Sequence, residues 1–396
     1  MQLIKSTRFA FAVCCAGMMS LAIAVNLLPV FLTTLQGSLG GQAGLSNEQL
    51  GRIGAVTFSG LVVGLLFTGP LADRIGAKLF TLVGNAMIAA GLVLLDLAPT
   101  YTAVLVAVFA MGVGAGVLVM VLSPIVAAVQ PHRRSAAMNW LHSFYCTGAV
   151  ATVLIGSLAL QFSIPWRSIS LGLAAMPLAV LLCFSVMHVP ALVDETTGQR
   201  QHLRGLLRDK YFLAALIAIF LGGATELGMA QWLPAYAEKS LGYSKLTGGM
   251  ALTAFSVAMA LGRIGIGMLG NRVPAVRTMI VGCAASVVFF IVGCFAPWPA
   301  VALGACILAG LAGSSLWPSM LGVAADRFPR GGASMFGILA AFGNLGGIAM
   351  PWIVGVAADG WGMHWGLATA TLCPLFMGLI LLSMRPRVIV SSHSLP

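Results

Sequence analysis

Long apolar runs separated by short polar segments dominate the chain. Apolar runs of about 20 residues are typical of membrane-spanning helices, whereas strands would show alternating apolar and polar positions. The runs predict twelve helices, near residues 8–35, 47–70, 77–97, 100–130, 136–162, 167–188, 211–236, 246–270, 276–296, 298–325, 332–358 and 364–384. We therefore expect an all-α membrane protein with twelve transmembrane helices.

One clearly polar stretch interrupts this pattern near the middle of the chain, at residues 189–210. It contains Asp194, Glu195 and Arg200, and it separates six predicted helices from six. Such a segment is typical of a linker between two halves. The predicted organisation is thus an N-terminal half at 1–188, a cytoplasmic linker at 189–210 and a C-terminal half at 211–396. Within the linker, residues 202–210 are predicted to form a short amphipathic helix on the inner leaflet.

The composition excludes a soluble globule. The chain is 59% hydrophobic and only 8% charged, with a mean hydropathy of +1.00. A soluble domain carries roughly 25% charged residues because its surface faces water. Lipid must therefore cover most of this surface, and a backbone facing lipid has to be helical or part of a closed barrel.

The net charge of +11 is explained by topology. With the N-terminus inside, all basic residues except Arg52, Arg167, Lys239, Lys245 and Arg263 fall in the predicted cytoplasmic segments. This asymmetry is the positive-inside rule, and it predicts an inner-membrane protein with both termini in the cytoplasm. Nucleic-acid binding is not needed to explain the charge.

The two halves also resemble each other. Three pairs of segments recur at about half-chain spacing: Gly69–Arg74 with Gly267–Arg272, Pro124 with Pro318, and Arg134–Ala137 with Arg330–Ala333. Internal repeats of this kind are typical of transporters, whose substrate site lies between the repeats near the bilayer midplane. The pattern predicts two pseudo-symmetric six-helix halves.

The segment Gly69-Pro-Leu-Ala-Asp73-Arg74-Ile-Gly76-Ala-Lys78 resembles the loop signature of the major facilitator superfamily, between helices 2 and 3. The resemblance covers essentially the whole chain and implies a fold that works by alternating access. It also implies a cytoplasmic latch between the halves. In that latch Asp73 would face the N-terminal end of helix 11, where the helix dipole favours an anion, and Arg74 and Lys78 would pair with acids or lipid phosphates. The latch residues implied are Gly69, Asp73, Arg74, Gly76, Lys78 and Arg134.

Further motifs resemble the fucose-permease-like branch of that superfamily, the proton symporters of fucose, galactose and glucose. The motifs are Met138–Phe144 with Gly148–Ala149, Glu226–Tyr236, Leu261–Arg263, Trp317–Ser319 and Gly343–Gly347. The resemblance implies proton-coupled symport of a small, sugar-like solute. The chain departs from the fucose permease itself, which carries functional acids in helices 1 and 4, because here helix 1 offers Asn26 and helix 4, at residues 100–130, contains no acid.

Glu226 and Arg263 are the charged residues placed deepest within predicted helices. An ionised carboxylate in the membrane costs several kcal/mol unless it is paired or hydrated, so such residues commonly mark proton relays. Two interpretations stay open at this point. Glu226 carries a coupling proton, with Arg263 as its partner or as a substrate contact, or the two form a fixed structural pair.

Polar and aromatic side chains in the helices are candidates for solute binding. Asn139, His142 and Cys146 form one stripe on helix 5, and amide and imidazole groups suit sugar hydroxyls. Asn26 and Asn344 occupy similar depths of helices 1 and 11, and Trp140, Trp232 and Trp317 offer ring faces on which a sugar can stack. Packing between helices is the alternative for each of them. The predicted substrate-binding residues are Asn26, Asn139, His142, Gln231, Trp232, Trp317 and Asn344.

We therefore expect a secondary active transporter that moves a small polar organic solute across the inner membrane with protons. Export of amphipathic compounds or lipids is one alternative, and a non-transporting membrane sensor is another. An enzyme is not expected, since the chain has no phosphate-binding glycine loop and no metalloprotease motif. We expect no cofactor, no metal and no nucleic-acid partner; the expected partners are the solute, protons and membrane lipids, and the protein is expected to be a monomer.

Overall fold

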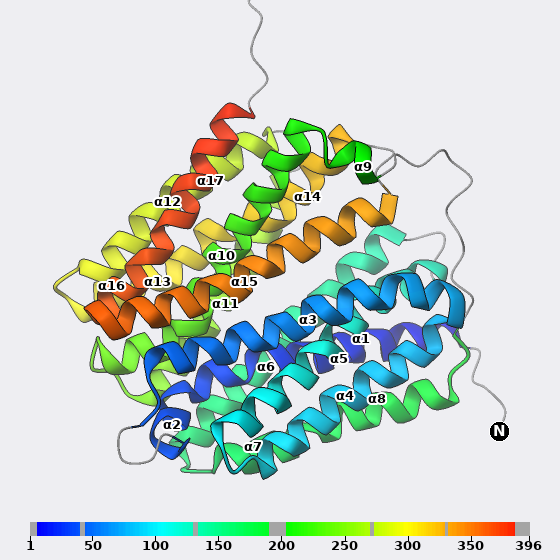
Figure 1. Ribbon diagram of the computed structural model, residues 1–396, viewed down its shortest axis with the longest axis horizontal. Helices are drawn as coiled ribbons and strands as arrows, with labels where there is room; N and C mark the ends of the chain where they lie inside the picture. Colours follow the sequence, from blue (N-terminus) through cyan, green and yellow to red (C-terminus); the bar gives the residue numbers. More distant parts are fainter. Residues whose placement is uncertain are drawn as a thin grey trace, which may run out of the picture.

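The computed structural model describes residues 6–39, 44–129, 134–189, 203–269, 273–328 and 332–384. These residues form a bundle of helices (Figure 1). Twelve spans within it, each one helix or consecutive helices, are long and apolar enough to cross a membrane. Their bounds agree with the predicted helices to within a few residues, and some helices are longer at their ends than predicted. The side chains of residues 134–139 lie outside the described set.

The helices follow one another in two sets. The first set is α1 (Thr7–Asn26), α2 (Leu28–Leu39), α3 (Asn47–Ile75), α4 (Ala77–Leu97), α5 (Tyr101–Val129), α6 (Arg134–Gln161), α7 (Trp166–Leu173) and α8 (Ala175–Val186). The second set is α10 (Lys210–Lys239), α11 (Lys245–Leu269), α12 (Ala275–Phe295), α13 (Pro299–Gly313), α14 (Leu316–Arg327), α15 (Gly332–Trp361), α16 (Met363–Ala368), η3 (Thr369–Thr371) and α17 (Leu372–Ser383).

The short helix predicted at residues 202–210 is only one turn long, as α9 (Leu203–Leu206). The reason is local: Asp209 caps the next helix, because its Oδ1 accepts hydrogen bonds from the backbone N–H groups of Tyr211 and Phe212. A residue in this capping role has an extended backbone, so the shorter helix must end before it. The rest of the predicted linker, residues 190–202, lies outside the described residues.

Four of the spans predicted as single helices are interrupted, each just ahead of a proline. Proline lacks an N–H group, so the carbonyl four residues earlier loses its helical partner and the helix kinks or breaks there. The junctions α1/α2, α7/α8, α13/α14 and α16/α17 precede Pro29, Pro177, Pro318 and Pro374, respectively.

Glycines let α5 pack closely against two neighbours at once. A Cβ on Gly112 would lie 2.0 Å from the carbonyl oxygen of Thr57 in α3, and one on Gly116 would lie 2.0 Å from that of Leu61. Gly114, between them, faces α4, where a Cβ would lie 2.5 Å from the carbonyl oxygen of Gly84. Small residues at membrane helix interfaces permit this backbone approach, so the alternating glycines hold α5 between α3 and α4.

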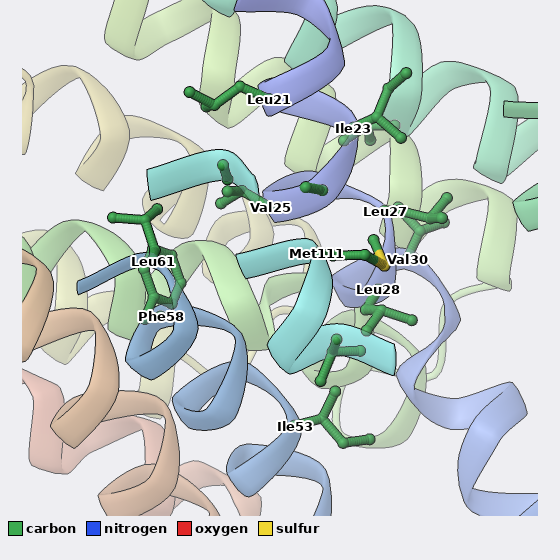
Figure 2. Packing of buried hydrophobic residues seen from close by; sticks show 14 of the residues in the cluster. Leu21, Ile23, Val25, Leu27, Leu28, Val30, Ile53, Phe58, Leu61 and Met111 are labelled. Atoms are coloured by element: carbon green, nitrogen blue, oxygen red, sulfur yellow. The ribbon is translucent and has the colours of Figure 1, made fainter. Parts of the chain in front are cut away.

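Apolar side chains fill the space between these helices. Leu27 and Leu28 at the α1/α2 junction, Ile53 and Leu61 of α3, and Met111 of α5 are all buried in one cluster (Figure 2). A core of this kind leaves little freedom to the backbone around the junction, so the polar side chain of Asn26 is held at a defined depth.

The two halves meet mainly through α3 and α15, which run antiparallel and side by side (Figure 1). We call the end of the bundle that carries the α3–α4 turn at Gly76 the basic end, and the opposite end, which carries the starts of α3 and α11, the distal end. The helices of the two halves converge at the distal end and diverge toward the basic end in Figure 1. Close contacts across the halves include Gly51 with Pro351 and Gly249 with Ser157, both in the distal part of the bundle.

Candidate functional site

Glu226 and Arg263 form an ion pair inside the C-terminal half. Arg263 Nη2 of α11 lies 2.9 Å from Glu226 Oε2 of α10, and the side chains are 30% and 18% exposed. The sulfur of Met259 lies 3.6 Å from the same guanidinium nitrogen. The structure thus brings together the two charges that the sequence placed deepest in the membrane.

A broken helix supplies the second partner of Arg263. Its Nε donates to the carbonyl oxygen of Ser314 at 3.2 Å, at the α13/α14 junction. This carbonyl is available because Pro318, four residues later, has no N–H to donate to it. Gly262 permits the approach, because a Cβ there would lie 2.3 Å from Ser314 Oγ. The proline motif in the sequence therefore positions the arginine through the carbonyl that it frees.

A small hollow lies beside the pair. Its lining comes from α10, α11 and α13: Thr225, Glu226, Phe255, Met259, Ala309, Gly310 and Gly313. Apart from Thr225, the neighbours of the carboxylate in this lining are apolar or glycine. The ion pair is thus the main polar feature on this side of α10.

The N-terminal half contributes a polar pair to the same region. Asn26 Nδ2 donates to the carbonyl oxygen of Ala22 at 2.9 Å and lies 3.4 Å from the hydroxyl of Tyr145 in α6. Tyr145 and its neighbour Cys146 lie within electrostatic range of both Glu226 and Arg263. Asn26 and Tyr145 therefore lie near the ion pair, on the other side of the boundary between the halves. The sequence analysis missed Tyr145, although it lies three residues after His142 on the same face of α6.

His142 also lies within electrostatic range of Arg263. The residue is exposed, as is Trp140, whose relative exposure is 64%. The side chain of Asn139 lies outside the described residues, so its predicted role stays a prediction.

Gln231 and Trp232 sit where α10 meets α3 and α15. Gln231 is buried, and its Oε1 would lie 3.3 Å from a Cβ on Gly54 of α3. Trp232 is completely buried, and its indole Nε1 donates to the carbonyl oxygen of Pro351 at 2.9 Å. No face of this ring is open to a solute in this conformation, so packing accounts for its contacts here and its predicted role in solute binding stays a prediction.

Trp317 and Asn344 lie in the C-terminal half. The ring of Trp317 packs on Gly343 and Gly223, where Cβ atoms would lie 2.6 and 2.9 Å from its edge. Asn344 is half-buried and bonds to the carbonyl oxygen of Ala340 at 2.9 Å. Both are therefore held by their own half rather than by groups of the N-terminal half.

The implied latch loop is placed only in part. Gly76 ends α3 with φ of 98° and ψ of 143°, a conformation that favours glycine. Lys78 donates to the carbonyl oxygens of Ser185 and Met187 at 2.9 Å, at the end of α8. Its ammonium thus contacts helix-end carbonyls here, and the implied pairing with an acid or a lipid phosphate stays a prediction. A Cβ on Gly69 would meet only the flexible end of Met120. The side chains of Asp73, Arg74 and Arg134 lie outside the described residues.

A set of polar contacts at the distal end went unnoticed in the sequence analysis. Asp359, near the end of α15, accepts hydrogen bonds from the backbone N–H groups of Asn47 and Glu48 at the start of α3. Lys239 of α10 donates to Asn47 Oδ1 at 2.9 Å. No local pattern identifies these partners, because they are more than 190 residues apart along the chain.

Fold and site together define a polytopic helical membrane protein of the transporter class, with two halves and a polar site between them. Comparison with family profiles identifies the family: residues 9–252 and 238–394 match the Major Facilitator Superfamily, to which this chain belongs. The resemblance read from the loop signature is thereby confirmed.

Curated relatives include multidrug resistance proteins named MdtL. The chain is 27% identical over 229 residues to the one from Escherichia fergusonii, and 28% identical over 230 residues to the one from Escherichia coli K12. Each match covers 55% of this chain and 58% of the relative, so it spans little more than half of either protein.

Solved structures resemble the fold over nearly its whole length. The Escherichia coli fucose:proton symporter superposes with a TM-score of 0.66 at 20% identity, covering 96% of this chain and all of that one. The human organic anion transporter TETRAN gives 0.70 at 18% identity, covering 96% of this chain and 100% of that one. A bacterial homologue of the human lysosomal transporter Spinster, in an inward-facing state, gives 0.76 at 13% identity, covering 95% and 96%. At these identities the likeness concerns the fold.

Proposed function

We propose that this protein is a proton-coupled secondary transporter of a small polar organic solute, with Glu226 as the proton carrier. The observation that carries the proposal is the Glu226–Arg263 pair in a membrane-spanning region, 2.9 Å between Nη2 and Oε2. Ionisable residues at such depth are rare and are found at substrate and ion pathways and in proton relays. The neighbouring Asn26–Tyr145 pair supplies polar groups from the other half.

The geometry supports a switch at Arg263. When Glu226 is ionised, it neutralises the guanidinium; when Glu226 takes up a proton, that partner is lost. Arg263 nevertheless stays in place through its Nε bond to the Ser314 carbonyl. Its Nη2 donor group is then available to a polar group of the solute, so proton binding and solute binding favour each other.

The surrounding groups support a solute with several hydrogen-bonding atoms. Tyr145 and Asn26 come from one half and Arg263 from the other. His142 lies within electrostatic range of the same charge. A polyol or sugar fits this mixture. Its binding to both halves would couple their movement.

Export of amphipathic compounds is the second candidate. Its support is the similarity to the MdtL multidrug resistance proteins, together with the exposed Trp140 ring. In this version the same proton on Glu226 would drive the solute in the opposite direction. The two candidates share their coupling residue and differ in substrate class and direction.

Flux in proteoliposomes tests both candidates. Purified protein is reconstituted, a pH gradient of either sign is imposed, and labelled monosaccharides and polyols are compared with a fluorescent amphipathic cation. Accumulation of a sugar or polyol in the same direction as proton flow supports the proposal. Movement of the cation in the direction opposite to proton flow supports the exporter. A solute flux that is the same with and without the pH gradient would overturn proton coupling. Asp96→Asn, a change of another acid in a membrane helix, is the matched control for Glu226→Gln.

We further propose that the basic end faces the cytoplasm and that the protein works as a monomer in the lipid bilayer. The support is the positive-inside distribution of charge. A green fluorescent protein fused to the C-terminus should fluoresce, since it folds in the cytoplasm and not after export through the general secretory route. A fluorescent protein fusion that stays dark, together with an alkaline phosphatase fusion at the same place that is active, would show the opposite topology.

A further inference from the structure

The contact between Asp359 and the first turn of α3 spans the two halves at the distal end. Asp359 Oδ1 accepts from the Asn47 N–H at 2.8 Å, and Oδ2 accepts from the Glu48 N–H at 2.7 Å. The first N–H groups of a helix have no partner within it, and the positive end of the helix dipole favours an anion. The carboxylate of one half thus satisfies two free donors of the other half.

Other contacts surround this carboxylate. Lys239 of α10 donates to Asn47 Oδ1, and the indole Nε1 of Trp352 donates to Glu48 Oε1, which also pairs with Arg52. Glu238, next to Lys239 at the end of α10, also accepts a hydrogen bond across the halves, from the hydroxyl of Thr33 in α2. All these contacts lie at the distal end, and those of Asp359, Lys239 and Trp352 join α3 to the C-terminal half.

The helices beneath these contacts run antiparallel and pack closely near the distal end. A Cβ on Gly355 would lie 2.3 Å from the carbonyl oxygen of Asn47, and one on Gly51 would lie 2.3 Å from that of Pro351. Further along, Gly347 faces Phe58, at 3.3 Å from the ring. The same antiparallel run places the C-terminal end of α3, which contains residue 73, at the end of the bundle where α15 begins at Gly332. Each helix thus carries an acid near its C-terminal end, at the level of the other helix's N-terminus.

We propose that Asp359 is the positioning residue of a latch that holds the distal end closed. It works in opposition to the latch that the family resemblance implies for Asp73 at the basic end. Because the halves diverge toward one end when they meet at the other, capping of α3 by Asp359 and capping of α15 by Asp73 exclude each other. This inference rests on the proposed function, because a transporter that works by alternating access closes each end of the bundle in turn. The distal end is then the outer end.

Hydrogen–deuterium exchange on the full-length chain in lipid nanodiscs, wild type and variants side by side, tests the latch without substrate. Asp359→Asn removes the charge and leaves one oxygen acceptor for two N–H donors. Helix-capping contacts of this kind shift an equilibrium roughly two- to thirtyfold. We expect faster exchange in distal peptides (47–58 and 347–361) and, in the same sample, slower exchange at the basic end (62–75 and 335–346). Asp73→Asn should produce the opposite pair of changes, and Asp96→Asn neither.

Two outcomes would overturn the proposal. Unchanged exchange at both ends would show that Asp359 does not stabilise closure of the distal end. Faster exchange at the distal end alone would show that it caps α3 locally without acting as a latch. Gly355→Ala gives a second route if Asp359→Asn does not fold, since its methyl group must push Asn47 away. It should produce the same paired change, whereas Gly360→Ala in the same helix, with nothing within 4 Å of its Cβ position, should not. An absent pair of changes for Gly355→Ala also counts against the latch.

The readout separates this inference from the proposed function. Exchange is measured at one pH and without solute, so it does not depend on Glu226. A protein that shows the paired changes but no proton-driven flux would retain the latch and lose the proton carrier. Proton-driven flux without the paired changes would retain the proton carrier and reject the latch.

Discussion

Arg263 links three elements of the C-terminal half, because its Nη2 pairs with Glu226 Oε2 at 2.9 Å while its Nε donates to the Ser314 carbonyl oxygen at 3.2 Å. The first contact is with a group that can take up a proton. The second is with a backbone carbonyl that cannot. Protonation can therefore remove one partner of the arginine, while the other partner keeps its side chain in place.

Glu226→Gln should abolish accumulation of solute against its gradient. A neutral glutamine imitates the permanently protonated acid, so exchange of solute between equal pools should persist and should no longer depend on pH. Uptake after a pH jump, with wild type and Asp96→Asn measured beside it, checks this. Accumulation that survives in the glutamine variant would leave the pair with a structural role only.

Arg263→Ala should destabilise the protein by about 3 kcal/mol, because it leaves a largely buried carboxylate without its partner. The exposures of 18% and 30% keep the value at the lower end of what such losses cost. The double variant Glu226→Gln/Arg263→Ala should lose less stability than the sum of the two single variants, Glu226→Gln and Arg263→Ala, since neither charge is then unpaired. Thermal unfolding in detergent measures all three. Additive losses in the double variant would contradict a coupled pair.

Gly112→Ala should destabilise the N-terminal half by about 1–3 kcal/mol, the usual cost of overpacking. Its methyl group would lie 2.0 Å from the carbonyl oxygen of Thr57, a backbone atom that cannot rotate away. Gly37→Ala is the control, because nothing lies within 4 Å of its Cβ position. The two unfolding temperatures should differ by several degrees, and equal values would show that α3 and α5 can separate at no cost.

Gly76→Ala should cost about 1–3 kcal/mol, because the backbone there has φ of 98° and ψ of 143°, and residues other than glycine are strained in that region. Gly69→Ala, in the same loop signature, should be nearly neutral, since only the flexible Met120 side chain must move. Unfolding of the two variants in detergent compares them directly. Equal losses would mean that packing, and not backbone conformation, decides the role of this segment.

The sequence by itself determined the class of the protein, its twelve spans and the family. These follow from local properties: the length of an apolar run decides whether a helix can cross the bilayer, and the loop signature Gly69–Lys78 is contiguous along the chain. Even the depth of Glu226 and Arg263 could be read from position within a run. Their pairing was one of the alternatives, because two opposite charges in lipid have a strong reason to meet.

Tertiary structure alone decided which partners the polar groups find. Tyr145 faces Asn26 because α6 packs on α1, and Asp359 caps α3 because two helices some 300 residues apart in sequence run antiparallel. Trp232 is enclosed where the sequence pattern allowed an exposed ring. The physical reason is common to all three: a side chain's neighbours across a helix interface depend on the rotation and register of two helices. Those are determined by the packing of the whole bundle, which the local sequence pattern does not contain.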